Sequence, residues 1–210
     1  MTKKERIDNL IRLLEAEYGR AVCTLDYANP LHLLVSTQLA AQCTDERVNM
    51  VTPALFERFP TAVDLMNADL PELEELIRST GFFRNKARNI KACCERIVTH
   101  FNGEVPGTME ELLSLPGVGR KTANVVLGEI FHVPGIIVDT HAGRLSRRIG
   151  LSSNTDPVKV EEDLMKIIPR DKWTVFSHWL VSHGRAVCNA RKPECERCTI
   201  KPFCNYGRNI

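Results

Sequence analysis

Residues 115–123 read Leu-Pro-Gly-Val-Gly-Arg-Lys-Thr-Ala and join two segments with helical character. The preceding residues 109–114 are amphipathic, and a second helix is expected to begin at Arg120. Gly117 and Gly119 permit a sharp turn with positive φ and a close approach to another molecule. Free amide groups at the start of a helix, together with the helix dipole, favour an anion. The stretch therefore predicts a phosphate-binding hairpin, whose expected contact residues are Gly117, Val118, Gly119 and Arg120.

The expected anion is a DNA phosphate. The chain contains no GxxxxGK[ST] pattern, which would indicate a nucleotide-binding loop. The alternative is an ordinary corner between two helices, in which a glycine ends the first helix. Two glycines separated by one residue and followed directly by Arg120 and Lys121 favour the phosphate-binding interpretation.

Four of the eight cysteines are clustered as Cys188-x6-Cys195-x2-Cys198-x5-Cys204. The first 19 residues are charged and amphipathic and contain no apolar signal segment, so we expect a chain that is not exported. In a reducing compartment, clustered cysteines bind metal more often than they form disulfides. The spacing alone leaves a zinc ion and a cubane iron–sulfur cluster both open. The other cysteines form no ligand pattern and are expected to be reduced and structural: Cys23, Cys43, Cys93 and Cys94.

The composition sets broad limits. A hydrophobic content of 43% and a charged content of 26% are ordinary for a globular protein, and no apolar run approaches the ~20 residues of a membrane span. The formal net charge is only +2, so affinity for nucleic acid has to come from local segments. Two basic segments are present, residues 84–96 and 188–210, although each alone reads as a solvated helix face.

Helical periodicity dominates the chain and predicts an all-α fold of roughly ten helices. Apolar residues recur at steps of three and four at residues 7–14, 73–77 and 90–97. Only residues 135–138 look extended. We expect a central helical domain at residues 22–133 and a second, discontinuous domain built from residues 1–21 and 134–210.

Three motifs together resemble the helix–hairpin–helix DNA glycosylases, and specifically the endonuclease III family. They are LPGVGRKTANVV at residues 115–126, VDTHAGRLSRR at residues 138–148, and the four-cysteine tail. The resemblance implies a six-helix domain and an iron–sulfur cluster domain with a DNA cleft between them. It also implies that the ligand set is for a [4Fe–4S] cluster: Cys188, Cys195, Cys198 and Cys204.

The resemblance places two catalytic residues. The family's nucleophilic lysine falls on Lys121, and its essential aspartate falls on Asp139. A carboxylate stabilises the positive charge that develops on the sugar when the C1′–N bond breaks, and an amine forms a Schiff base at C1′. A solvated cation is the alternative role for Lys121, and a helix N-cap is the alternative role for Asp139.

The resemblance also implies residues that contact DNA. Gln42 corresponds to a glutamine that enters the duplex where the damaged base was. Phe82 stands where the family carries an aliphatic wedge, usually leucine, and Phe83 beside it is expected in the core. His141 is expected to contact DNA or the lesion, or to serve only in capping. Arg191 and Lys192 lie in the cysteine loop and are expected to meet phosphates.

The predicted function is that of a bifunctional DNA glycosylase and abasic-site lyase of base excision repair. Its partner is double-stranded DNA that contains oxidised pyrimidines or abasic sites. We expect a monomer in the cytoplasm of a bacterium or archaeon, associated with the nucleoid and with no membrane. Mismatch glycosylases of the same superfamily are disfavoured because they usually lack a lysine at the position of Lys121. A DNA-binding module without catalysis is the alternative from another class.

Overall fold

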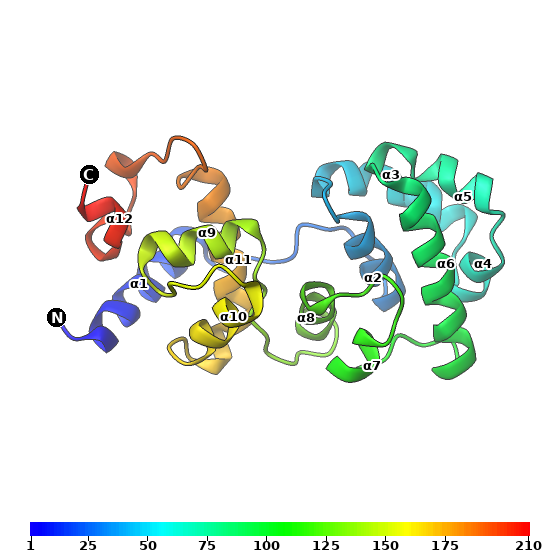
Figure 1. Ribbon diagram of the computed structural model, residues 1–210, viewed down its shortest axis with the longest axis horizontal. Helices are drawn as coiled ribbons and strands as arrows, with labels where there is room; N and C mark the ends of the chain where they lie inside the picture. Colours follow the sequence, from blue (N-terminus) through cyan, green and yellow to red (C-terminus); the bar gives the residue numbers. More distant parts are fainter. The chain divides into compact units, whose positions relative to one another are not determined.

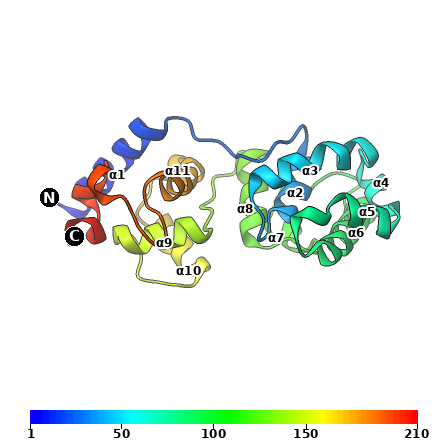
Figure 2. The same ribbon diagram turned by 90° about the horizontal axis from the view of Figure 1, so that it is seen from above.

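The computed structural model describes all 210 residues and contains helices, turns and loops but no strand. The predicted all-α class is confirmed. The chain divides into two compact units, one formed by Cys23–Val133 and the other by Met1–Val22 with Pro134–Ile210. Figures 1 and 2 show the helices of each unit from two directions. No helix combines the length and the apolar character that crossing a bilayer requires.

The unit Cys23–Val133 is built around helix α2, which contacts α3, α6 and α8. In both views α2 lies between α6 and α8 (Figures 1 and 2). Its sequence, PLHLLVSTQL, carries no charged side chain, as expected for a helix enclosed on several sides. The elements are α2 Pro30–Leu39, α3 Asp45–Arg58, α4 Ala62–Asn67, α5 Leu70–Leu76, the 3₁₀ turn η1 Arg78–Thr80, α6 Phe83–His100, α7 Met109–Leu113 and α8 Arg120–Glu129.

The second unit joins the N-terminal helix to the last third of the chain. Helix α1 contacts α11, and α11 in turn contacts α9. The α-helices are α1 Lys3–Tyr18, α9 Thr140–Ile149, α10 Pro157–Met165, α11 Trp173–Ala186 and α12 Asn205–Arg208. Three 3₁₀ turns accompany them: η2 Arg170–Lys172, η3 Cys195–Arg197 and η4 Lys201–Phe203.

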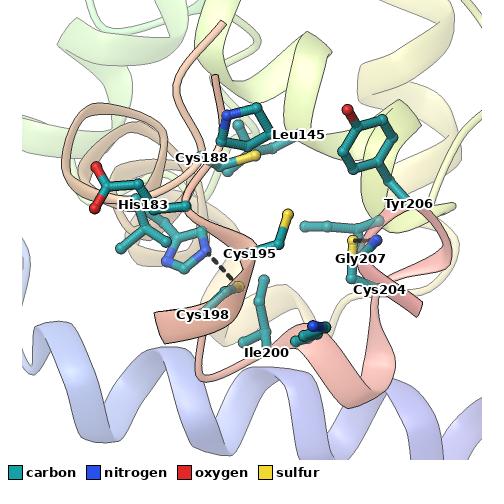
Figure 3. Close-up of a pocket in the computed structure, with 14 residues that line it drawn as sticks. Leu145, His183, Cys188, Cys195, Cys198, Ile200, Cys204, Tyr206 and Gly207 are labelled. Carbon is teal, nitrogen blue, oxygen red and sulfur yellow. Dashed lines mark hydrogen bonds between the residues drawn. The ribbon is translucent and has the colours of Figure 1, made fainter. Parts of the chain in front are cut away.

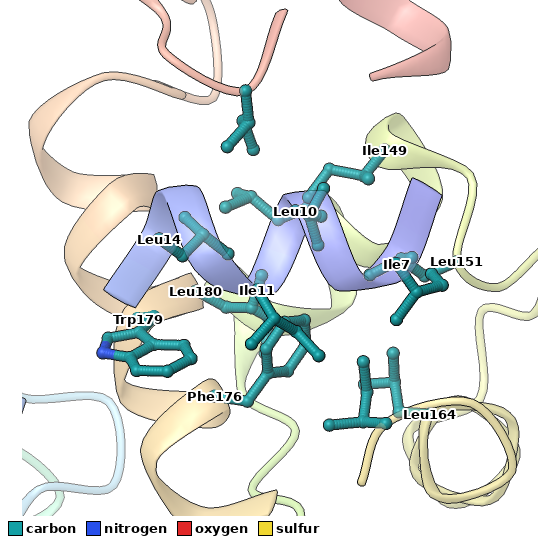
Figure 4. Packing of buried hydrophobic residues seen from close by; sticks show 14 of the residues in the cluster. Ile7, Leu10, Ile11, Leu14, Ile149, Leu151, Leu164, Phe176, Trp179 and Leu180 are labelled. Atoms are coloured by element: carbon teal, nitrogen blue, oxygen red, sulfur yellow. The ribbon is translucent and has the colours of Figure 1, made fainter. Parts of the chain in front are cut away.

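One hydrophobic core holds this second unit together. The apolar stripe of α1 packs on Phe176, Trp179 and Leu180 of α11 (Figure 4). The stripe consists of Ile7, Leu10, Ile11 and Leu14, the residues that share one helix face by their spacing. Ile200 and Cys204, which lie in the cysteine-rich segment of residues 188–204, belong to the same core as the α1 stripe. This segment therefore packs against the rest of the unit.

Candidate functional site

The hairpin forms between α7 and α8, and α8 begins at Arg120 as predicted. Gly117 has φ +75°, and a Cβ there would lie 2.9 Å from Asn89 Cβ and 3.0 Å from Gln38 Oε1. Glycine is therefore required both by the backbone and by the space. The expected positive φ at Gly119 is wrong, because its φ is −98°, which is ordinary extended backbone. A Cβ at Gly119 would meet nothing within 4 Å, so this side of the hairpin is open.

The hairpin presents fewer outward amides than the sequence suggests. The Val118 amide donates to the Leu115 carbonyl at 3.1 Å, and the Val118 side chain is buried. Its N–H is therefore used inside the turn. The N-cap of α8 is Gly119, which has no side chain to accept from the first turn. Most helices here have such a capping side chain, as α2 does from Asn29. The start of α8 is thus left open to an external acceptor such as a phosphate.

Lys121 is the second residue of α8, and its side chain is exposed. The nearby Cys23 thiol is largely buried, and burial raises its pKa to about 11. The Lys121 ammonium acts in the opposite direction and favours the thiolate, so the two side chains lie within electrostatic reach of each other. The structure therefore places an amine at the surface in the first turn of α8, within electrostatic reach of a largely buried thiol.

Gln42 and Phe82 lie on two different turns of the same unit. Both are exposed, and both have left-handed backbone, with φ 55° at Gln42 and φ 49° at Phe82. Non-glycine residues in this region cost about 1–3 kcal/mol and are concentrated at functional sites. The two side chains line one pocket with Gly117, which holds about 550 Å³ of atom-free space, part of it open to solvent. The pocket is further lined by Gln38, Ala41, Asn85, Lys86 and Asn89.

The basic segment of residues 84–96 is only partly a surface feature. Lys86 is 6% exposed, and its ammonium is bound to backbone carbonyls inside the unit. Lys91 likewise donates to the carbonyls of Met66 and Ala68. The expected core position of Phe83 is wrong, because its ring is half-buried and Arg84 Cζ lies 5.2 Å from the ring centroid.

The sequence pattern placed Lys86 on a solvated helix face and did not predict that its side chain is buried. A signal was present, since Lys86 lies four residues before Ile90 on the apolar stripe of α6 and therefore on its buried face.

Asp139 caps α9 in the other unit. Its Oδ1 accepts from the Ala142 amide at 2.7 Å, and the side chain is half-buried. His141 follows in the first turn, where its Nδ1 lies 3.1 Å from Arg144 Nη2. A Cβ on Gly184 would lie 2.8 Å from the same Nδ1, so glycine at that place on α11 leaves room for the ring. Burial lowers the pKa of His141, which keeps the imidazole neutral at neutral pH.

The four clustered cysteines surround one pocket in the unit that contains α1 and α11. Figure 3 shows their side chains arranged around a common space, with His183 hydrogen-bonded to Cys198. The pocket holds about 350 Å³ of atom-free space, part of it open to solvent. None of the four forms a disulfide, and Leu145, Ile149, Val187 and Ile200 give the pocket apolar walls. Burial raises the pKa of Cys198 to about 11, so a ligand is needed to make it a thiolate.

Hydrogen-bond donors face the sulfur atoms. Arg148 Nη1 donates to Cys188 Sγ at 3.4 Å, and the Gly207 amide donates to Cys204 Sγ at 3.3 Å. Such donors favour thiolates and tune iron–sulfur centres. Nowhere in the chain do three or more histidine, cysteine, aspartate or glutamate side chains converge closely enough for one metal ion. Four thiols that line one pocket with apolar walls are a ligand set that an iron–sulfur cluster can use.

Arg191 and Lys192 lie on the loop between Cys188 and Cys195, and both are exposed. Neither side chain makes a hydrogen bond or an ion pair within the chain. Two other basic residues of the tail pair with carboxylates nearby: Arg197 with Glu194 at 2.6 Å and Lys201 with Glu196 at 2.8 Å.

Comparison with known proteins agrees with this geometry. Residues 35–170 match the model of the HhH-GPD superfamily of base excision DNA repair proteins. An endonuclease III from Synechocystis sp. is 56% identical over 97% of this chain and 93% of that protein. The chain belongs to the endonuclease III family.

Membership of the endonuclease III family extends to the three-dimensional structure. An endonuclease III from Bacillus subtilis is 43% identical over 91% of this chain and 88% of that protein. A solved structure of a trapped endonuclease III–DNA covalent intermediate, with an estranged adenine, superposes with a TM-score of 0.94. It is 43% identical and covers 100% of this chain and 99% of that chain. The resemblance of the three sequence motifs to this family is thereby confirmed.

Proposed function

We propose that this protein is a bifunctional DNA glycosylase and abasic-site lyase of base excision repair, which removes oxidised pyrimidines from duplex DNA. The observation that carries the proposal is the exposed amine of Lys121 in the first turn of α8, beside an uncapped helix start that can hold a phosphate. Membership of the endonuclease III family supports it, as does the covalent protein–DNA intermediate formed by a relative.

In the proposed first step, the lone pair of the deprotonated Lys121 Nζ attacks C1′ of the damaged nucleotide. The C1′–N bond breaks, its electron pair leaves with the base, and the base takes up a proton. The new C1′–Nζ ammonium loses a proton, and the freed electron pair of Nζ then opens the C1′–O4′ bond. O4′ takes up a proton, which leaves an iminium between C1′ and Nζ. The developing positive charge on the sugar is stabilised by the carboxylate of Asp139.

In the second step the strand is cut. The iminium acidifies the C2′ hydrogens, and a proton leaves C2′ to a base or to water. The electron pair forms the C2′–C3′ double bond while the C3′–O bond breaks, and the phosphate departs with that pair. Hydrolysis of the iminium releases Lys121. Position 121 therefore separates a lyase from a glycosylase that uses water.

Before either step the base has to leave the duplex. Gln42 and Phe82 are proposed to occupy and wedge the gap, with Phe82 acting in place of the family's usual leucine. A phenyl ring that is 65% exposed and held on a left-handed turn is available to stack on a base. The phosphate contacts are proposed for Gly117, Gly119 and Arg120, whereas Val118 supports the turn. His141 is proposed to face the DNA beside Asp139.

Cys188, Cys195, Cys198 and Cys204 are proposed to hold a [4Fe–4S] cluster. When bound, the cluster supplies folding free energy to a tail that is too short to build its own core. It does not take part in bond breaking. The residues of the loop between Cys188 and Cys195 are thereby held in one conformation, with Arg191 and Lys192 directed to phosphates. The protein is proposed to act as a monomer in the cytoplasm, associated with the nucleoid.

The cluster proposal predicts the metal content. Protein purified without oxygen is expected to contain about four irons and matching sulfide per chain and to absorb near 400 nm as a brown solution, an approximate value for iron–sulfur charge transfer. Elemental analysis and visible absorbance measure both. One tightly bound zinc without iron would refute the assignment.

The loop proposal predicts a change in salt dependence. The logarithm of the DNA association constant falls linearly with the logarithm of the salt concentration, and each phosphate contact contributes about 0.9 to the slope. Replacing both Arg191 and Lys192 with alanine is therefore expected to reduce this slope by about two. Filter binding or anisotropy at several salt concentrations measures the slope. The matched control replaces Lys3 and Lys4 of α1, which are also exposed, with alanine and changes the net charge equally. If both pairs give the same slope, the cysteine loop does not meet DNA.

The proposed function is tested by borohydride trapping. Borohydride is expected to reduce the iminium and link the protein covalently to duplexes that contain thymine glycol or an abasic site, but not to undamaged duplex. Denaturing electrophoresis detects the adduct. A protein that binds damaged duplex without forming an adduct would be a binding module and would contradict the proposal.

A further inference from the structure

Lys86 is a buried cation with two backbone partners. Its Nζ donates to the carbonyl of Leu39 and to the carbonyl of Thr80, both at 2.7 Å. The side chain comes from the first turn of α6. Burial lowers the pKa of Lys86, and no carboxylate lies among its partners, so the ammonium is held by these carbonyls.

Both carbonyls stand at the ends of helices. Leu39 is the last residue of α2 and Thr80 is the last residue of η1. Carbonyls at a helix end have no intrahelical partner and carry partial negative charge, so a cation is favoured at both positions. One ammonium thus bonds to the end of two elements that are 41 positions apart in the sequence.

Each of these ends leads directly into a turn that carries a proposed DNA-penetrating residue. Gln42 follows Leu39 by three residues, and Phe82 follows Thr80 by two. Both residues have left-handed backbone, which costs free energy and persists only where the surroundings hold it. Lys86 also lines the pocket that Gln42 and Phe82 share, so it lies under both turns.

We propose that Lys86 is a positioning residue that ties the Gln42 turn to the Phe82 turn, so that the two side chains enter the duplex as one unit. The inference rests on the proposed function, in which Gln42 and Phe82 fill and wedge the gap left by the extruded base. Without this tie each turn relaxes by itself, and the pair no longer matches the spacing of the opened duplex.

A general role in stability is the competing explanation, and the chain contains its own control. Lys91, also on α6, donates to two carbonyls at the end of α4, those of Met66 and Ala68. It has the same chemistry but lies against neither turn. Lys86→Met and Lys91→Met each remove an ammonium and keep roughly the volume of the side chain. Lys86 is buried and Lys91 is partly buried, so a merely structural role predicts that any loss of excision follows the loss of thermal stability in both variants.

The experiment compares these two variants on one duplex that contains thymine glycol beside 2-aminopurine. Single-turnover excision is expected to slow by about 10-fold to 100-fold in Lys86→Met, the scale of a small misplacement of reacting groups. The fluorescence rise that reports unstacking of 2-aminopurine is expected to be lost. Lys91→Met is expected to keep the excision rate and the fluorescence rise within about threefold of wild type, whatever thermal stability it loses.

Two further measurements separate positioning from folding. Trapping on a single-stranded abasic oligonucleotide needs no base pair to be opened, so Lys86→Met is expected to trap there as wild type does. Lys86→Met is also combined with Gln42→Ala or Phe82→Ala. The double variant is expected to slow excision by less than the product of the two single-variant factors, because Lys86 acts through those residues. If Lys86→Met does not fold, Lys86→Arg replaces it, because arginine keeps hydrogen-bond donors on a longer side chain. Lys86→Arg is expected to reduce the 2-aminopurine fluorescence rise, and its double variants with Gln42→Ala or Phe82→Ala are expected to slow excision by less than the product of the single factors.

Equal effects of Lys86→Met and Lys91→Met, or normal unstacking by Lys86→Met, would overturn this inference while leaving the proposed function in place. Failure of the proposed function has a different signature, because wild-type protein would then neither trap nor unstack the duplex. That result would overturn both.

Discussion

Replacing Lys121 with glutamine is expected to abolish the covalent adduct and the strand cleavage at abasic sites. Glutamine has no basic nitrogen that can attack C1′, so no Schiff base forms and no β-elimination follows. The side chain is exposed in the first turn of α8, and glutamine is a good helix former, so the fold and the binding of damaged DNA are expected to persist. Borohydride trapping and a cleavage assay on an abasic duplex measure the loss, and anisotropy measures the binding.

Lys159→Gln is the matched control for this variant. Lys159 is also an exposed lysine in the first turn of a helix, α10, and its replacement removes the same charge. It is expected to trap and cleave as wild type does. If Lys121→Gln still cuts abasic sites through an adduct that borohydride traps, the nucleophile is another residue and the assignment fails.

Replacing Asp139 with asparagine is expected to slow base excision by at least about 100-fold, the usual scale for one positioned charge or acid–base group. The Asp139 side chain accepts from the Ala142 amide and so begins α9. Asparagine is as good an N-cap as aspartate, so the helix start is kept and only the charge is lost. Affinity for damaged DNA is expected to remain near normal. Single-turnover excision of thymine glycol measures the effect.

Asp156→Asn is the control that separates charge from capping. Asp156 caps α10 in the same unit and accepts from the Lys159 amide at 3.0 Å. Its replacement is expected to leave excision unchanged. If Asp139→Asn excises the base as fast as wild type, Asp139 is no more than a helix cap, because asparagine keeps the cap. Equal slowing by both variants would mean that the loss of any negative charge in this unit, and not the position of Asp139, slows the reaction.

Local signals explain why most of the helices of this protein can be predicted from its sequence. The apolar stripe of residues 7–14 lies on one face of α1 and forms its buried side. Thr108 and Asp139 cap the helices that follow them, and α8 starts directly after Gly119. Such signals act within a few residues and do not depend on what the helix packs against.

The direction in which individual side chains point was harder to predict from the sequence. Residues 84–96 read as a basic surface, yet Lys86 and Lys91 turn inward to carbonyls that come from other elements. Phe83, expected in the core, is half-buried beside Arg84. These outcomes depend on which carbonyls and side chains the neighbouring elements bring near, and that information is distributed over distant parts of the chain.

By itself, the sequence determined the helical class, the hairpin and the cluster of four cysteines, because caps, periodicity and spacing are properties of short segments. It also indicated the family, since three motifs in order are specific together. Only the tertiary structure decided that Gln42, Phe82 and Gly117 line one pocket and that one buried ammonium bonds to the carbonyls at the ends of α2 and η1. The physical reason is that carbonyls at helix ends lack intrahelical partners and, when buried, need a hydrogen-bond donor from another element. Which donor lies nearby depends on the packing of the whole unit.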